Sequence, residues 1–134
     1  MPVRHIVTLL ISALLLSGSI DAQQRGRGGY DYWAPQREMI RRGQQAILMC
    51  NGLFTANRSL EQVFAQELAF LPEPVGTARG GDYVVDRDLR AVAIGAPNGS
   101  IPVMRAAFRA GIGCVILAPE QTFADIDSLP SFGM

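Results

Sequence analysis

The sequence contains no lysine, and its only histidine is His5. All 12 basic residues are therefore arginines. Histidine is the commonest general base near neutral pH, and lysine supplies Schiff bases and activates the serine of some hydrolases. Arginine replaces neither, because its guanidinium stays protonated and cannot accept a proton. The amino-acid composition therefore indicates no particular activity, and it argues against an enzyme that is active on its own.

Charge and metal-ligating residues exclude further classes of function. The 12 basic and 12 acidic residues give a formal net charge of zero. Because nucleic-acid-binding proteins normally carry a basic surplus, we expect no nucleic-acid partner. Two cysteines without a neighbouring histidine make a zinc site improbable, and the glycine-rich loop at 76–82 lacks the lysine of a phosphate loop. We expect no metal, no cofactor and no catalytic residue in this chain.

The amino-terminal residues follow the three-part pattern of a secretory signal peptide. Arg4 precedes an apolar run over residues 6–16, and small polar residues follow as far as Ala22. The run is too short to span a bilayer, which takes about 20 residues. We expect residues 1–22 to be removed and the protein to be exported, periplasmic or extracellular, without stable membrane insertion. An uncleaved membrane anchor is the alternative.

Export would place the only two cysteines, Cys50 and Cys114, in an oxidising compartment. Each lies in a short apolar run, 46–50 or 113–117, that we predict to be a strand. If the two strands are close, a single disulfide would stabilise the fold by roughly 4 kcal/mol in the chain-entropy account. Two buried free thiols are the alternative, since cysteine packs as a small hydrophobe and the sequence supplies no distance.

The rest of the chain divides into three parts. Residues 23–45 contain a flexible segment of glycine, arginine and aromatic residues, then a possible short helix over 36–45 with Met39 and Ile40 facing inward. Residues 46–119 form a small α+β region, in which a capping box at Ser59 begins a helix with an apolar stripe. Residues 120–134 carry no helix or strand signal, and we predict an unstructured or truncated tail.

Strand signals within the α+β region cover 83–86 and 89–95, and residues 96–100 form a strong turn. Residues 101–108 fit either a helix or a returning strand. We predict an α+β fold of three to five short, mostly antiparallel strands with one or two helices.

Three segments resemble parts of a known family. They are the cysteine run CNGLFT at 50–55 with the capped helix after it, the Val-Asp-Arg turn at 85–87, and the strand FRAGIGC at 108–114. Their order resembles the start of secreted serine hydrolases of the β-lactamase and penicillin-binding-protein superfamily. The nearer likeness is to the β-lactamase-related, 6-aminohexanoate-dimer-hydrolase-like branch, and it covers residues 46–119.

The resemblance implies a larger protein. Members of this family act through an S-x-x-K motif downstream of the Gly-x-Gly-Cys strand, and this sequence has none. It implies that the chain is the amino-terminal structural part of an exported serine hydrolase, truncated before that motif. The chain would then be an incomplete part of a larger α/β hydrolase-type sheet and inactive alone. Its partner would be the missing carboxy-terminal portion of the same fold.

Two other functions stay open. One is a small secreted binding module that meets a partner through the aromatic segment at 30–33. The other is an enzyme that uses carboxylates alone, since Asp82, Asp86 and Asp88 cluster in the sequence and Asp125 lies near Asp127. Aspartates at this spacing are usually solvated turn residues, so this last function is the weakest of the three.

Overall fold

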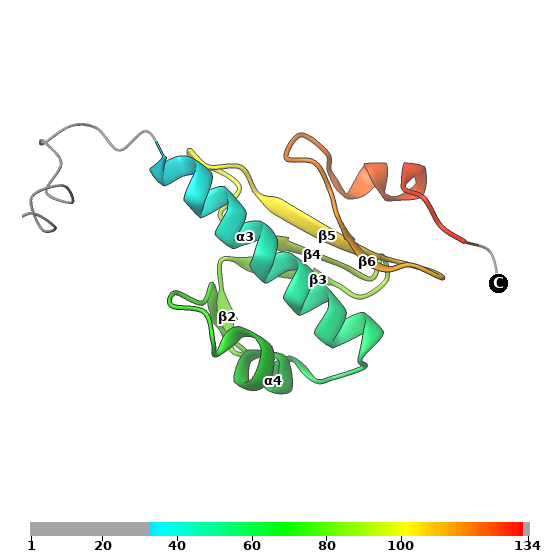
Figure 1. Ribbon diagram of the computed structural model, residues 1–134, viewed down its shortest axis with the longest axis horizontal. Coiled ribbons are helices and arrows are strands. Elements are labelled where there is room, and N and C mark those ends of the chain that lie inside the picture. The colour runs from blue at the N-terminus through cyan, green and yellow to red at the C-terminus, as the bar shows by residue number, and fades with distance from the viewer. Residues whose placement is uncertain (1–32, 133–134) are drawn as a thin grey trace, which may run out of the picture. The chain divides into compact units, whose positions relative to one another are not determined.

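The computed structural model describes residues 33–132 (Figure 1). The expected signal peptide at 1–22 and the glycine- and arginine-rich segment up to residue 32 lie outside the described residues. Helices and antiparallel strands confirm the α+β class. Within residues 33–132 the strands number six, in two sheets, and not three to five.

The longest element of the described residues is helix α3, Ala34–Cys50, which continues directly into the π-helix η1, Asn51–Thr55. Its buried residues Gly43, Ala46, Met49 and Cys50 recur at helical spacing. The predicted strand at 46–50 is therefore wrong. A run of five apolar residues fits a strand or a buried helix equally, and the helical pattern of the residues before it decides between them.

A second helical segment follows, α4 at Leu60–Val63 and the π-helix η2 at Phe64–Leu68. The predicted capping box at Ser59 is present, because the Gln62 amide donates to the Ser59 hydroxyl and the Ser59 amide donates to the Gln62 side chain. This segment packs closely on η1. A Cβ atom at Gly52 would lie 2.6 Å from Cγ2 of Val63, so only glycine allows the approach.

The main sheet is a four-stranded antiparallel meander in the order β3-β4-β5-β6. Its strands are β3 at Tyr83–Asp86, β4 at Ala91–Ile94, β5 at Met104–Arg109 and β6 at Gly113–Ile116. The ambiguous segment at 101–108 is thus a returning strand, which places Met104 opposite Ile94. A second sheet pairs only β1, Gly76–Thr77, with β2, Gly80–Gly81.

Both faces of the main sheet are covered. Helix α3 lies across one face (Figure 1), where Val92, Ile94 and Ala106 pack against residues of α3. On the opposite face, Ala91 and Ala107 pack against Leu117 and Ile126. Every residue of β4 is buried as a result, which explains its uninterrupted apolar sequence.

The segment after β6 contains a short helix, so residues 120–132 of the expected unstructured or truncated tail at 120–134 are not wholly unstructured. Residues Phe123–Ser128 form a 3-10 helix, η3, capped by the reciprocal hydrogen bonds of Thr122 and Asp125. Two arginines of β5 attach this segment, since Arg105 donates to the Gln121 carbonyl and Arg109 to the Leu129 carbonyl. Its order comes from these tertiary contacts, which a search for local apolar periodicity does not detect.

The side chain of Gln45 ties helix α3 to the loop before β1. This side chain is 2% exposed. Its amide donates to the Glu73 carbonyl at 3.1 Å, and its carbonyl oxygen accepts from the Val75 amide at 2.6 Å. Buried backbone groups of a loop need such partners.

We predict that Gln45→Ala lowers the free energy of unfolding by about 2 kcal/mol, because two backbone groups of the loop lose their partner. The measurement is urea denaturation followed by circular dichroism. The matched control is Gln44→Ala, an exposed position on the same helix, which should change stability by less than about 0.5 kcal/mol. Equal effects of the two substitutions would contradict the assigned role of Gln45.

Candidate functional site

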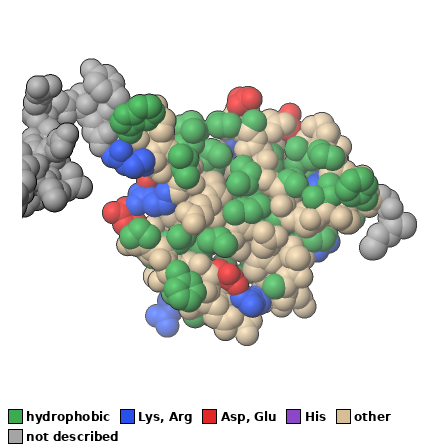
Figure 2. Space-filling view, viewed as in Figure 1, with side chains coloured by type: hydrophobic (Ala, Val, Ile, Leu, Met, Phe, Trp, Pro, Cys, Tyr) green, Lys and Arg blue, Asp and Glu red, His purple; other side chains and the backbone are tan. Residues whose placement is uncertain are grey.

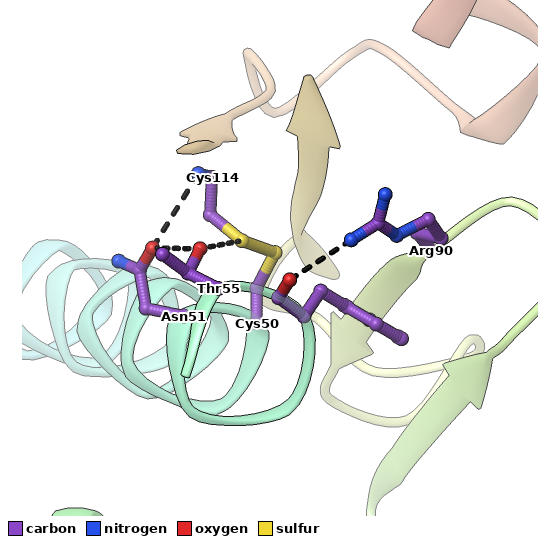
Figure 3. The surroundings of a disulfide bond; sticks show 6 residues. Cys50, Asn51, Thr55, Arg90 and Cys114 are labelled. Carbon is purple, nitrogen blue, oxygen red and sulfur yellow. Dashed lines mark hydrogen bonds between the residues drawn. A yellow bond between two sulfur atoms is a disulfide. The ribbon is translucent and has the colours of Figure 1, made fainter. Parts of the chain in front are cut away.

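A disulfide joins Cys50, the last residue of α3, to Cys114 in β6 (Figure 3). The two Cα atoms are 6.0 Å apart, and 64 positions separate the cysteines in the sequence. The predicted pairing is therefore present, although it joins a helix to a strand and not two strands. Cys50 is fully buried, and Cys114 is partly exposed.

Polar side chains of η1 surround the exposed end of this disulfide. The Asn51 Oδ1 atom accepts hydrogen bonds from the Thr55 hydroxyl at 3.1 Å and from the Cys114 amide at 3.4 Å. The Thr55 Oγ1 atom lies 4.0 Å from the Cys114 sulfur. Asn51 therefore satisfies a backbone amide of the edge strand β6 that has no strand partner on that side within residues 33–132. Thr55 lies beside the sulfur of Cys114, the more exposed of the two cysteines.

Arg90 joins the turn between β3 and β4 to the same end of the molecule. Its guanidinium donates to the Phe54 carbonyl at 2.9 Å, and its Cζ atom lies 3.6 Å from the centroid of the Phe108 ring. A guanidinium over an aromatic face contributes about 1 kcal/mol at a solvent-exposed site. Arg90 also has a φ of 51°, a conformation that non-glycine residues rarely adopt.

A cluster of four charged residues lies at the other end of α3. Arg41 forms ion pairs with Glu38 and Glu73, and the Arg42 Nε atom lies 2.8 Å from Glu38 Oε1. Arg42 also donates to the carbonyls of Ile101 and Pro102. Two positive and two negative charges compensate one another here, so the cluster is a structural junction and not a site for a charged ligand.

The pKa of Glu38 reflects this cluster. Partial burial alone would raise the pKa, but the hydrogen bonds and charges of Arg42 and Arg41 outweigh it. The net result is a pKa below the ordinary value of the carboxyl group. The ionised form is therefore the one that the folded protein favours.

An apolar groove runs between α3 and the edge strand β6. Six residues line it: Met39, Ile40, Gly43, Gln44, Met104 and Ile116. Ile40 is 67% exposed and Ile116 is 46% exposed, so the expectation that Ile40 faces inward is wrong. Hydrophobic side chains gather across the face on which α3 lies (Figure 2). Gly43 keeps the floor of the groove open, because its missing side chain would point toward Met104.

Two of the acidic residues considered in the sequence, Asp86 and Asp125, hold local turns. The Asp86 carboxylate accepts from the Leu89 amide at 2.8 Å in the β3–β4 turn, and the Asp125 carboxylate accepts from the Thr122 amide at 2.6 Å. Neither arrangement resembles a pair of carboxylates facing each other across a cleft. Within residues 33–132, no three histidine, cysteine, aspartate or glutamate side chains gather as a metal site would require.

Comparison with protein-family models, with curated proteins and with solved structures finds no match to this chain. Among the helices of the described part of the chain, none has both the length and the apolar character needed to cross a membrane.

Sequence reasoning located the two cysteines but missed the residues around them. Asn51 and Thr55 are four positions apart, which places them on the same side of one helix. Because residues 46–50 were expected to form a strand, this helical relationship between Asn51 and Thr55 was not predicted. Continuing the helical period of 36–45 through Cys50 would have revealed it. Arg90 carries no comparable local signal, because its partners Phe54 and Phe108 lie far away in the sequence.

We predict that replacing both cysteines by serine lowers the free energy of unfolding by about 4 kcal/mol, because the unfolded chain regains the entropy of an open loop. Urea denaturation of the variant and of the oxidised protein measures the difference. Chemical reduction of the unaltered protein should give a similar loss. A loss below about 1 kcal/mol in both experiments would show that the bond does not constrain the unfolded chain.

We also predict that Glu38 makes stability depend on pH. Since its pKa is lowered in the folded state, its contribution is present above the ordinary carboxyl pKa and is lost as the pH falls through the folded value. Glu38→Gln should therefore reduce the loss of unfolding free energy on acidification below about pH 4.5. Glu120→Gln, at an exposed position, is the control and should leave the acid limb of the profile unchanged.

Proposed function

We propose that this chain is the amino-terminal structural part of an exported serine hydrolase of the β-lactamase-like superfamily, and that it contributes no catalytic residue. The observation that carries the proposal is the exposed apolar groove between α3 and β6. Both faces of the sheet are already covered, yet the neighbouring side chains of Ile40 and Ile116 remain exposed to solvent. Apolar surface of this kind typically marks a contact with another part of a structure.

The arrangement of the resembling segments supports the same proposal. The segments at 50–55, 85–87 and 108–114 are far apart in the sequence, yet the first and third meet at the disulfide end of α3. Arg90, in the turn after the second, contacts Phe54 and Phe108 of the other two. The first and third of these segments are therefore neighbours in the structure, and Arg90, three residues after the second segment, lies beside both, which supports the proposal that they form one structural unit.

The chemistry of the described residues is consistent with a structural role. Residues 33–132 contain neither lysine nor histidine. A serine nucleophile needs a neighbouring group that accepts its proton, and no lysine or histidine is present to do so in this part of the chain. Ser59, for example, caps α4. We therefore assign nucleophile and base to another part of the hydrolase and the rigid sheet-and-helix support to this chain.

A small exported binding module is the second candidate. The same groove, together with Trp33, which is 70% exposed, would then contact a separate protein. The localisation that we propose, periplasmic or extracellular, is the same in both cases, and the disulfide is compatible with it.

The two candidates differ in the protein that carries residues 33–132 in the cell. We expect an antibody against these residues to detect, in the exported fraction, a polypeptide or stable complex that reacts with a fluorophosphonate probe for active serine hydrolases. The isolated 134-residue chain should neither react with the probe nor cleave chromogenic esters or lactams. Detection of this chain only in species that never react with the probe would contradict the hydrolase proposal.

Groove variants provide a control for that experiment. Ile40→Asp places a charge in the groove and should abolish the probe reaction or release this chain from the complex, because the contact loses apolar burial. Leu89→Asp, at an exposed position in the β3–β4 turn and away from the groove residues, should leave the reaction unchanged. Equal behaviour of the two variants would argue that the groove is not the contact surface.

A further inference from the structure

The two sulfur atoms of the disulfide differ in their surroundings. Cys50 is fully buried and belongs to the main hydrophobic core with Met49, Leu53 and Ala106. Cys114, the second residue of β6, packs against the edge of this core and is partly exposed. A thiolate that attacks a disulfide must reach one sulfur on the side opposite the other. The core closes that approach at Cys50, so only Cys114 is open to attack.

Thr55 stands in the approach to Cys114. Its hydroxyl lies 4.0 Å from the Cys114 sulfur and is held by the Asn51 side chain. In the view of Figure 3, Thr55 and Cys50 lie on opposite sides of that sulfur. Thr55 is the last residue of η1 and is itself exposed, so a reagent from solvent meets it before the disulfide.

We propose that Cys114 is the site at which an external thiol, such as that of a dithiol oxidoreductase of the export compartment, exchanges with this protein, and that Thr55 controls access to it. The attacking thiolate forms a bond to the Cys114 sulfur, the bond between the two cysteines breaks, and Cys50 leaves as a thiolate. A second external thiol then releases Cys114. The disulfide gains two electrons, and the two external thiols are oxidised to one disulfide.

The same geometry makes the exchange slow. Attack at the accessible Cys114 releases the Cys50 thiolate into an apolar core, where a charge is poorly solvated. Attack at Cys50 would release the better-solvated Cys114 thiolate, but that sulfur is out of reach. Accessibility therefore favours attack at Cys114, whereas the stability of the leaving thiolate favours attack at Cys50. This conflict slows reduction of the disulfide in the folded protein. This inference does not depend on the hydrolase proposal.

The first test identifies the attacked sulfur. The oxidised protein is incubated with glutathione without denaturant, quenched with acid, alkylated under denaturing conditions and mapped by peptide mass spectrometry. We expect glutathione on Cys114 and the alkyl group on Cys50. Glutathione on Cys50, or on both cysteines equally, would overturn the assignment.

The second test measures the role of Thr55. Thr55→Ala removes the hydroxyl and the methyl group and should raise the rate of reduction several-fold, whereas Thr55→Ser keeps the hydroxyl and should stay near the original rate. The rate should increase linearly with thiol concentration. A plateau at high thiol would mean that reduction follows unfolding, and it would overturn direct attack. Equal rates for all three proteins would overturn the control by Thr55.

Discussion

The bond between Cys50 and Cys114 fixes the carboxy-terminal end of helix α3 to the edge of the main sheet. Several residues around this disulfide are packed closely against one another. The helix continues as η1, whose Gly52 has no room for a side chain beside Val63, and Asn51 binds the edge of β6. Arg90 brings the β3–β4 turn to the same place through Phe54 and Phe108. The relative positions of helix, sheet and second helical segment therefore depend on one short region.

The sequence predicts the parts of this fold that have local causes. The capping box at Ser59 and the hairpin around Asp86 need only neighbouring residues, and both are present. The α+β class follows from the mixture of such signals. The predicted strand at 46–50 failed because apolar residues alone do not distinguish a strand from a buried helix. The prediction of an unstructured tail failed for a different reason. Helix η3 packs against residues of β4, β5 and the segment after β6, which lie far from it in the sequence or carry no local signal.

The apolar groove between α3 and β6 was harder to predict than the fold. Two of the groove residues, Met39 and Ile40, were expected to face inward, and which side of α3 is exposed depends on where the sheet lies. Ile40 and Gly43 are three positions apart on one helix, but only the structure shows that Ile116 of β6 lies beside them. In contrast, the absence of lysine and histidine from residues 33–132 is evident from the sequence alone, because it does not depend on how the residues are arranged.

Several arginine side chains connect parts of the backbone that are distant in the sequence. Four of them donate to backbone carbonyls distant in the sequence: Arg42 to Ile101 and Pro102, Arg90 to Phe54, Arg105 to Gln121 and Arg109 to Leu129. A guanidinium offers five donors in a rigid plane, whereas a lysine ammonium is a flexible point charge. Exchanging arginine for lysine would preserve the net charge and still loosen the loops. These four arginines serve as crosslinks between backbone segments, a role that depends on the shape of the guanidinium as well as on its charge.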